Sequence, residues 1–207
     1  RDKGTTESPV RHAATKGNSM GFRVLLIAVS GKDPDSVHRD YGVTPTGEYE
    51  EIPESPVTGA LLPNGAYLLY INDDIVPDDP VLASLSKGAS LIACYANETV
   101  MNSLTSSWRD GVEEWSVFHD AQEAIGHLEI SGDPPDQLKS IQERLLAEQE
   151  GTEGTDFVFD IPDELFAALG GMRYDQDIEG APPEPWQALA RAAARPVARK
   201  RWWWPFG

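Results

Sequence analysis

The sequence predicts an α+β domain: a mostly antiparallel sheet of five to seven strands, with three or four helices packed largely on one face. Three observations predict it. Short apolar runs bounded by glycine and proline recur along the chain. The dipeptide Asp110-Gly111 separates two alternating segments, which is typical of a β-hairpin. Leucines at helical spacing occupy residues 136–150. We expect one acidic domain over residues 20–180.

The hairpin is the clearest local signal. A two-residue turn at 110–111 predicts the cross-strand pairs Arg109–Val112, Trp108–Glu113, Ser106–Trp115 and Leu104–Val117. This register places Trp108 and Trp115 on one face, because a slip of one residue turns a side chain to the other face. We expect that face to lie in the core. The alternative interpretation is an aromatic platform for a ligand.

The chain begins with a polar extension, residues 1–19, which has no hydrophobic period and does not start with Met. We interpret it as a disordered extension or a non-native upstream segment. Residues 22–30 form an apolar run that predicts a central strand. A short helix over 35–41 follows, with Asp33 as its N-cap and Gly42 as its end.

Residues 44–65 are rich in proline and predict a long connection, in which Tyr49 and Ile52 form a short edge strand. Beyond it the pattern predicts strands over 66–72 and 90–97, with a helix over 81–86 between them.

After the hairpin, the predicted elements are a strand over 125–131, a helix over 136–150, a strand over 156–161 and a helix over 163–169. The proline-rich residues 181–185 indicate a domain boundary. We therefore expect 181–207 to be a linker and a basic, Trp-rich tail, with one or two helical turns over 186–194.

The net charge is −17, and it is unevenly distributed. Residues 20–180 contain 8 Lys and Arg against 31 Asp and Glu, whereas both ends are basic. Such a surface argues against nucleic acid binding through the main domain, because phosphates require basic side chains. It is compatible with a basic protein partner, with cation binding, or with solubility alone.

The single cysteine, Cys94, excludes an internal disulfide. It lies in an apolar run, which predicts a buried and inert thiol and fits a reducing, cytoplasmic location. The longest apolar run, residues 24–29, is far shorter than the roughly 20 residues of a membrane span. Residues 20–31 resemble an export signal faintly, with an apolar run that is too short for one.

Four carboxylates in one loop are candidate metal ligands, since Ca²⁺ sites are built from oxygen-rich loops. They are Asp73, Asp74, Asp78 and Asp79. The spacing departs from the EF-hand pattern and lacks its glycine. Asp79 also precedes Pro80 as a helix N-cap. We therefore favour capping and solvation over a metal site.

The candidate catalytic residues are His119, Asp120, His127 and Cys94. A thiol beside a histidine is a nucleophilic pair, and two histidines with carboxylates are transition-metal ligands. The usual hydrolase, phosphate-binding and zinc motifs are missing from the sequence. A structural hydrogen bond is therefore the favoured role for His119, with a hydrolase or metal-dependent enzyme as the alternative. We expect no cofactor.

The C-terminal tail combines basic and aromatic residues, which suit lipid headgroups or an acidic partner. The contact candidates are Arg199, Lys200, Arg201, Trp202, Trp203 and Trp204. The interpretation of the tail that we favour is docking onto the acidic domain of the same chain, or disorder. The second interpretation is a peripheral contact with a membrane surface.

Three segments carry a resemblance: residues 22–29, WRDGVEEWSVFHD at 108–120, and FDIPDEL at 159–165. With them the chain, over residues 20–179, resembles a group of uncharacterised small acidic bacterial proteins. The resemblance implies a self-contained bacterial domain and brings no activity. Some acidic bacterial domains are antitoxin or immunity proteins that mask a basic toxin, which is an analogy of composition. The favoured function is therefore a non-catalytic, acidic protein-interaction module with a basic protein partner.

Overall fold

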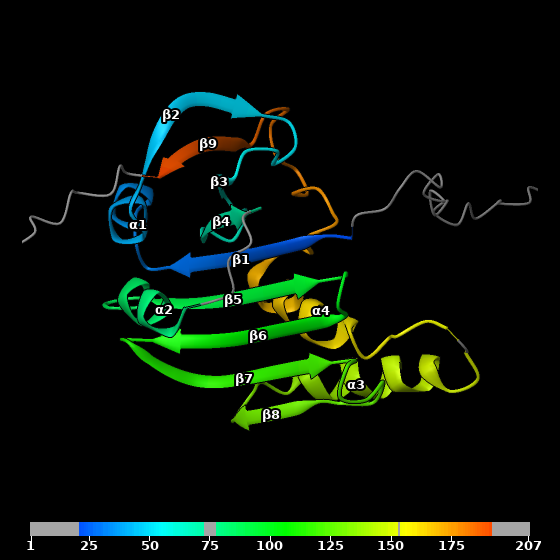
Figure 1. Ribbon diagram of the computed structural model, residues 1–207. Coiled ribbons are helices and arrows are strands. Elements are labelled where there is room, and N and C mark those ends of the chain that lie inside the picture. The colour runs from blue at the N-terminus through cyan, green and yellow to red at the C-terminus, as the bar shows by residue number, and fades with distance from the viewer. Residues whose placement is uncertain (1–20, 73–77, 153, 192–207) are drawn as a thin grey trace, which may run out of the picture.

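The computed structural model describes residues 21–72, 78–152 and 154–191, which form nine strands and four helices (Figure 1). The α+β class and the antiparallel sheet are confirmed, but the sheet is larger than the five to seven strands predicted. Every strand pair in the described residues is antiparallel.

The strand order is β2-β9-β3-β4-β1-β5-β6-β7-β8, with β1 at the centre. The strands are β1 (Arg23–Ser30), β2 (Val43–Glu50), β3 (Val57–Leu61), β4 (Tyr67–Ile71), β5 (Ser90–Asn97), β6 (Asn102–Arg109), β7 (Val112–Asp120), β8 (Glu129–Gly132) and β9 (Trp186–Arg191). The helices are α1 (Pro34–Tyr41), α2 (Asp79–Leu85), α3 (Gln137–Gln149) and α4 (Asp160–Gly170).

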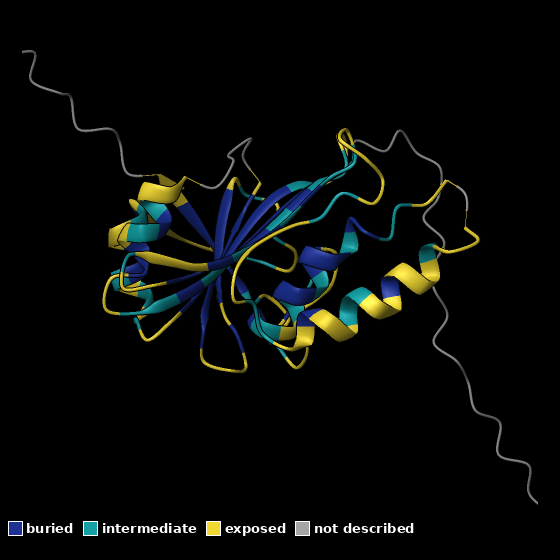
Figure 2. Cartoon of the chain, turned by 90° about the horizontal axis from the view of Figure 1, so that it is seen from below, coloured by how far each residue is buried: buried dark blue, intermediate teal, exposed yellow. Residues whose placement is uncertain are grey.

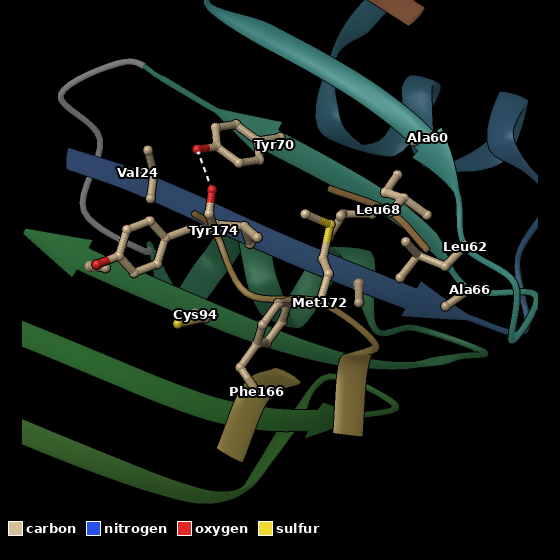
Figure 3. Packing of buried hydrophobic residues seen from close by; sticks show 14 of the residues in the cluster. Val24, Ala60, Leu62, Ala66, Leu68, Tyr70, Cys94, Phe166, Met172 and Tyr174 are labelled. Carbon is tan, nitrogen blue, oxygen red and sulfur yellow. Dashed lines mark hydrogen bonds between the residues drawn. The ribbon is translucent and has the colours of Figure 1, made fainter. Parts of the chain in front are cut away.

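Helices cover both faces of the sheet, which corrects the prediction that they lie largely on one (Figure 2). The α1/α2 face buries Leu25, Ile27 and Val29 of β1 with side chains of those two helices. The α3/α4 face buries the alternate residues of β1, and Phe166 of α4 is one of the cluster residues labelled in Figure 3. Because β1 is apolar on both sides, each side needs a covering layer.

The end signals of α1 act as predicted. The Asp33 carboxylate accepts a hydrogen bond from the Ser36 backbone N–H at 2.9 Å, and Gly42 ends the helix at φ 82°. Helix α2 begins earlier than predicted, with Asp79 already inside it and Asp78 at the N-cap position.

The hairpin turn is confirmed, since Asp110 and Gly111 both have positive φ. The register beyond it is wrong, because a β-bulge between Ser107 and Trp108 brings Ser107, not Ser106, opposite Trp115. Trp108 therefore packs on the α1/α2 face and Trp115 on the α3/α4 face. Both are core residues, but the single aromatic face does not exist.

Residues 186–191 form β9 between β2 and β3, rather than helical turns. The predicted boundary at 181 therefore falls inside the sheet-forming part of the chain. Most of the predicted 44–65 connection is also strand, and Pro45 is tolerated because β2 is an edge strand. The strand predicted over 156–161 does not form, because residues 156–159 form a loop and residues 160–161 begin α4. The strand predicted over 125–131 is reduced to β8.

Candidate functional site

An open hollow of about 1060 Å³ lies where β1 begins, β5 ends and α4 begins. Four carboxylates and two guanidinium groups line it. They are Glu98, Asp156, Asp160, Asp175, Arg23 and Arg173. Negative charge is therefore in excess on this surface.

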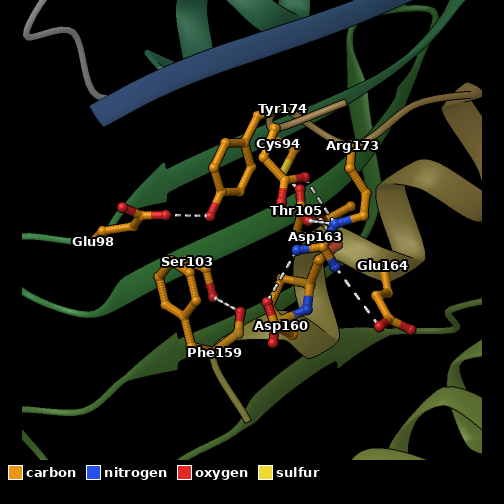
Figure 4. Close-up of polar contacts among 12 residues, drawn as sticks. Cys94, Glu98, Ser103, Thr105, Phe159, Asp160, Asp163, Glu164, Arg173 and Tyr174 are labelled. Atoms are coloured by element: carbon orange, nitrogen blue, oxygen red, sulfur yellow. Dashed lines mark hydrogen bonds and ion pairs between the residues drawn. The ribbon is translucent and has the colours of Figure 1, made fainter. Parts of the chain in front are cut away.

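Arg173 is the centre of an ion-pair cluster (Figure 4). Its Nε lies 3.2 Å from Asp163 Oδ2 and 3.0 Å from Asp175 Oδ1. Its Nη2 lies 3.2 Å from Asp160 Oδ1, and its Nη1 lies 3.7 Å from Glu164 Oε1. One guanidinium thus serves four carboxylates.

Asp163 is the most buried member of this cluster, with no exposed side-chain surface. Burial raises the pKa of Asp163 to about 7, against the lowering effect of Arg173 and with help from Asp175 and Asp160. Burial likewise raises the pKa of Asp160. Asp163 and Asp160 therefore keep their protons to higher pH than free carboxyl groups do.

Hydrogen bonds hold the walls of the hollow in place. Tyr174 Oη donates to Glu98 Oε1 at 2.8 Å, and Glu98 Oε2 accepts from the Phe22 backbone N–H at 2.9 Å. Two side chains of β6 donate to carbonyls at the start of α4: Ser103 to Phe159 at 2.7 Å and Thr105 to Pro162 at 2.6 Å. The start of α4 is therefore fixed to the sheet.

Cys94 belongs to this buried cluster, with its Sγ 3.9 Å from Asp163 Oδ1. Burial, then the charge of Asp163, raises the pKa of the thiol, so the thiol stays protonated. His119 lies two strands away and two residues further along. By strand geometry the two Cα atoms are on the order of 12 Å apart, so the structure does not form a thiol–imidazole pair.

The structure does bring His119, Asp120 and His127 together. His119 is fully buried, with Nδ1 2.7 Å from the His127 carbonyl oxygen and Nε2 3.0 Å from Asp156 Oδ2. Each ring nitrogen of His119 therefore contacts an oxygen atom of the protein. His127 Nδ1 accepts from the Asp120 backbone N–H at 2.9 Å. These contacts tie β7 to the chain before β8 and to the start of α4, and they occupy both His119 nitrogens.

Of the candidate metal ligands, Asp73 and Asp74 lie outside the described residues, and Asp78 and Asp79 start α2. Across the described ranges, no group of three or more His, Cys, Asp or Glu side chains could hold a metal ion. The tail candidates, residues 199–204, also lie outside the described residues.

Two smaller pockets continue the hollow. A pocket of about 230 Å³ shares Tyr174 and Asp175 with it, and a pocket of about 250 Å³ shares Asp177 and Trp186 with the second. We call the three joined pockets the acidic groove. It is lined by six carboxylates and two guanidinium groups, those of Glu51, Glu98, Asp156, Asp160, Asp175, Asp177, Arg23 and Arg173.

Sequence reasoning missed this groove and its central Arg173. A signal was present, because Arg173 is the one basic residue in the sequence between Arg144 and Arg191, among many acidic residues. A lone cation in such a stretch is a candidate partner for buried carboxylates.

No protein-family model, curated protein or solved structure matches this chain. Its function is therefore argued from the site alone. In the described part of the chain, no helix has the length and apolar character needed to cross a membrane.

Proposed function

We propose that the protein is a non-catalytic binding module that holds a basic segment of a partner protein in the acidic groove. The observation that carries the proposal is the groove itself, three pockets that share lining residues and together present six carboxylates and two guanidinium groups. A basic segment would neutralise carboxylates that Arg173 alone leaves in excess.

The shape of the groove favours a peptide segment over a compact ligand. Its three pockets follow one another through shared residues, so an extended chain would place successive side chains in successive pockets. The net charge of −17 would also speed the encounter with a basic partner and repel nucleic acid.

An enzymatic role receives less support from the same geometry. His119 is buried with both nitrogens bonded, and the Cys94 thiol is buried and protonated. Neither group is in a position to reach a substrate, and general acid–base or nucleophilic chemistry requires that reach. An immunity or antitoxin role is one form of the binding function, in which the basic partner is a toxin.

The test is a binding titration with a labelled peptide of alternating arginine and glycine, about nine residues long, at physiological salt. The groove variant carries Glu51→Gln, Asp175→Asn and Asp177→Asn, all at exposed positions. The matched control removes three exposed carboxylates elsewhere, with Glu113→Gln, Asp133→Asn and Glu143→Gln. We expect the groove variant to bind the peptide at least about tenfold more weakly than the unmodified protein. Salt at this concentration screens distant charges more than charges in direct contact.

The control variant should bind within about twofold of the unmodified protein, since the three residues it changes do not line the groove and solvent screens their charges. Equal weakening in both variants would show that only the overall charge attracts the peptide. That result, or the absence of binding at physiological salt, would overturn the proposal.

A further inference from the structure

The middle pocket of the acidic groove is lined by four aromatic side chains that come from distant parts of the sequence. Phe22 precedes β1, Tyr70 lies on β4, Tyr174 follows α4, and Trp186 begins β9. The Phe22 and Tyr174 ring centroids are 5.4 Å apart with a 59° tilt. The Tyr70 and Trp186 centroids are 5.5 Å apart at 75°. The rings therefore form two tilted pairs around one cavity.

Hydrogen bonds within the protein hold two of the aromatic side chains in place. Tyr70 Oη donates to the Tyr174 carbonyl oxygen at 3.1 Å, which is the dashed contact in Figure 3. Tyr174 Oη is in turn held by Glu98. Tyr70, Tyr174 and Trp186 are buried, whereas Phe22 is 48% exposed and can meet an incoming group. Such preorganisation lowers the entropy lost on binding.

The charged side chains that line this pocket are both acidic and exposed. They are Asp177 and Asp175, and the carboxylate of Asp175 is also paired with Arg173 at 3.0 Å. No described Lys or Arg side chain lines the pocket itself. The volume of about 230 Å³ is below the roughly 300–1,000 Å³ of small-molecule sites. The pocket therefore suits a single side chain of a larger partner rather than a free metabolite.

We propose that this pocket is a cation–π anchor that takes one arginine or lysine side chain of the basic segment. The inference rests on the proposed function and adds to it the place where specificity arises. Aromatic ring faces attract a cation most strongly where it is partly desolvated, and a carboxylate nearby adds Coulomb attraction. The two outer pockets of the groove would then attract the basic segment by charge, and the middle pocket would determine which of its residues binds there.

Replacement of arginine by citrulline in the peptide tests the anchor, because citrulline keeps the shape of arginine and removes its charge. Each arginine of the alternating peptide is replaced in turn. We expect one position to lower affinity about tenfold and every other position less than about threefold, as cation–π pairs exceed exposed charge pairs. Equal, small losses at every position would overturn the anchor.

A second measurement reads the pocket directly. The Trp186 indole N–H resonance, assigned through the backbone, is followed by NMR while N-acetyl-arginine methylamide is added. We expect a saturable shift of this resonance and none with the citrulline analogue. A shift of similar size with an uncharged leucine analogue would show an apolar pocket instead.

Phe22 is about half exposed, so we expect variants at this position to fold. Phe22→Leu removes the ring face and keeps apolar volume, and we expect about fivefold weaker peptide binding. Phe22→Tyr keeps the ring, and this variant should bind the peptide within about twofold of the unmodified protein. If Phe22→Leu binds normally while the groove variant loses binding, the anchor is wrong and the groove function stands. If no peptide binds in the groove, both proposals fail.

Discussion

Both faces of the sheet bury apolar residues of β1, but the polar groups buried on the two faces differ in charge. On the α1/α2 face the buried polar contact is neutral, His38 Nε2 to Tyr67 Oη at 2.6 Å. Burial lowers the pKa of His38, so its ring is neutral at pH 7. On the α3/α4 face the cluster is charged, with Asp163 and Arg173 beside Cys94.

This difference separates a face whose buried polar contact is neutral from the face that carries the proposed binding surface. Burying an ion pair stabilises a protein little, because desolvation offsets the attraction. A charged cluster therefore says more about function than about stability where its members reach a solvent-open surface, as Arg173 and Asp160 do at the acidic groove. Three expected effects, from the largest to the smallest, test this difference between the faces.

The largest effect is expected for Arg173→Met, which leaves Asp163 buried without its cation. We expect the free energy of unfolding to fall by about 3–5 kcal/mol in urea denaturation at pH 8. Arg109→Met is the control, since Arg109 is 59% exposed and paired with Glu114 outside the cluster, and it should cost less than about 1 kcal/mol. Equal costs for the two variants would mean that the cluster is not a buried charge site.

The second effect is a pH dependence of opposite sign on the two faces. The pKa of Asp163 is about 7 in the folded protein and near 3.8 when unfolded. Between these values the folded state binds more protons, so Asp163 makes stability fall as pH rises, by roughly 2–4 kcal/mol over the window. His38, with its lowered pKa, makes stability rise with pH below about 6.5.

Urea denaturation across pH 4–8 measures both slopes. Asp163→Asn should remove the fall above pH 5, while His38→Gln should remove the opposing rise below pH 6.5. An unchanged profile in Asp163→Asn would show that another group, such as Asp160, carries the proton.

The smallest effect is expected for Tyr67→Phe, which removes the hydroxyl that contacts His38. Loss of one neutral buried hydrogen bond should cost about 1 kcal/mol at pH 8, read from the shift of the urea midpoint. A cost as large as that of Arg173→Met would erase the distinction between the two faces.

Much of the local structure could be predicted from the sequence. The Asp110-Gly111 turn and the start and end of α1 depend on backbone angles that a few neighbouring residues decide. The bulge between Ser107 and Trp108 could not be predicted, because it depends on which face of the sheet has helices that bury each tryptophan. The candidate residues His119 and His127 do meet, but as a structural contact with Asp156 as an unpredicted partner.

By itself, then, the sequence determined the acidic α+β class, the hairpin turn and the start and end of α1, since short-range sterics and hydrogen bonding specify them. Only the tertiary structure decided that β9 lies between β2 and β3, that helices cover both faces, and that Arg173 meets Asp163. Each of these joins residues far apart in the chain. No local pattern records such a pairing, because its free energy comes from burial against partners that only the folded chain supplies.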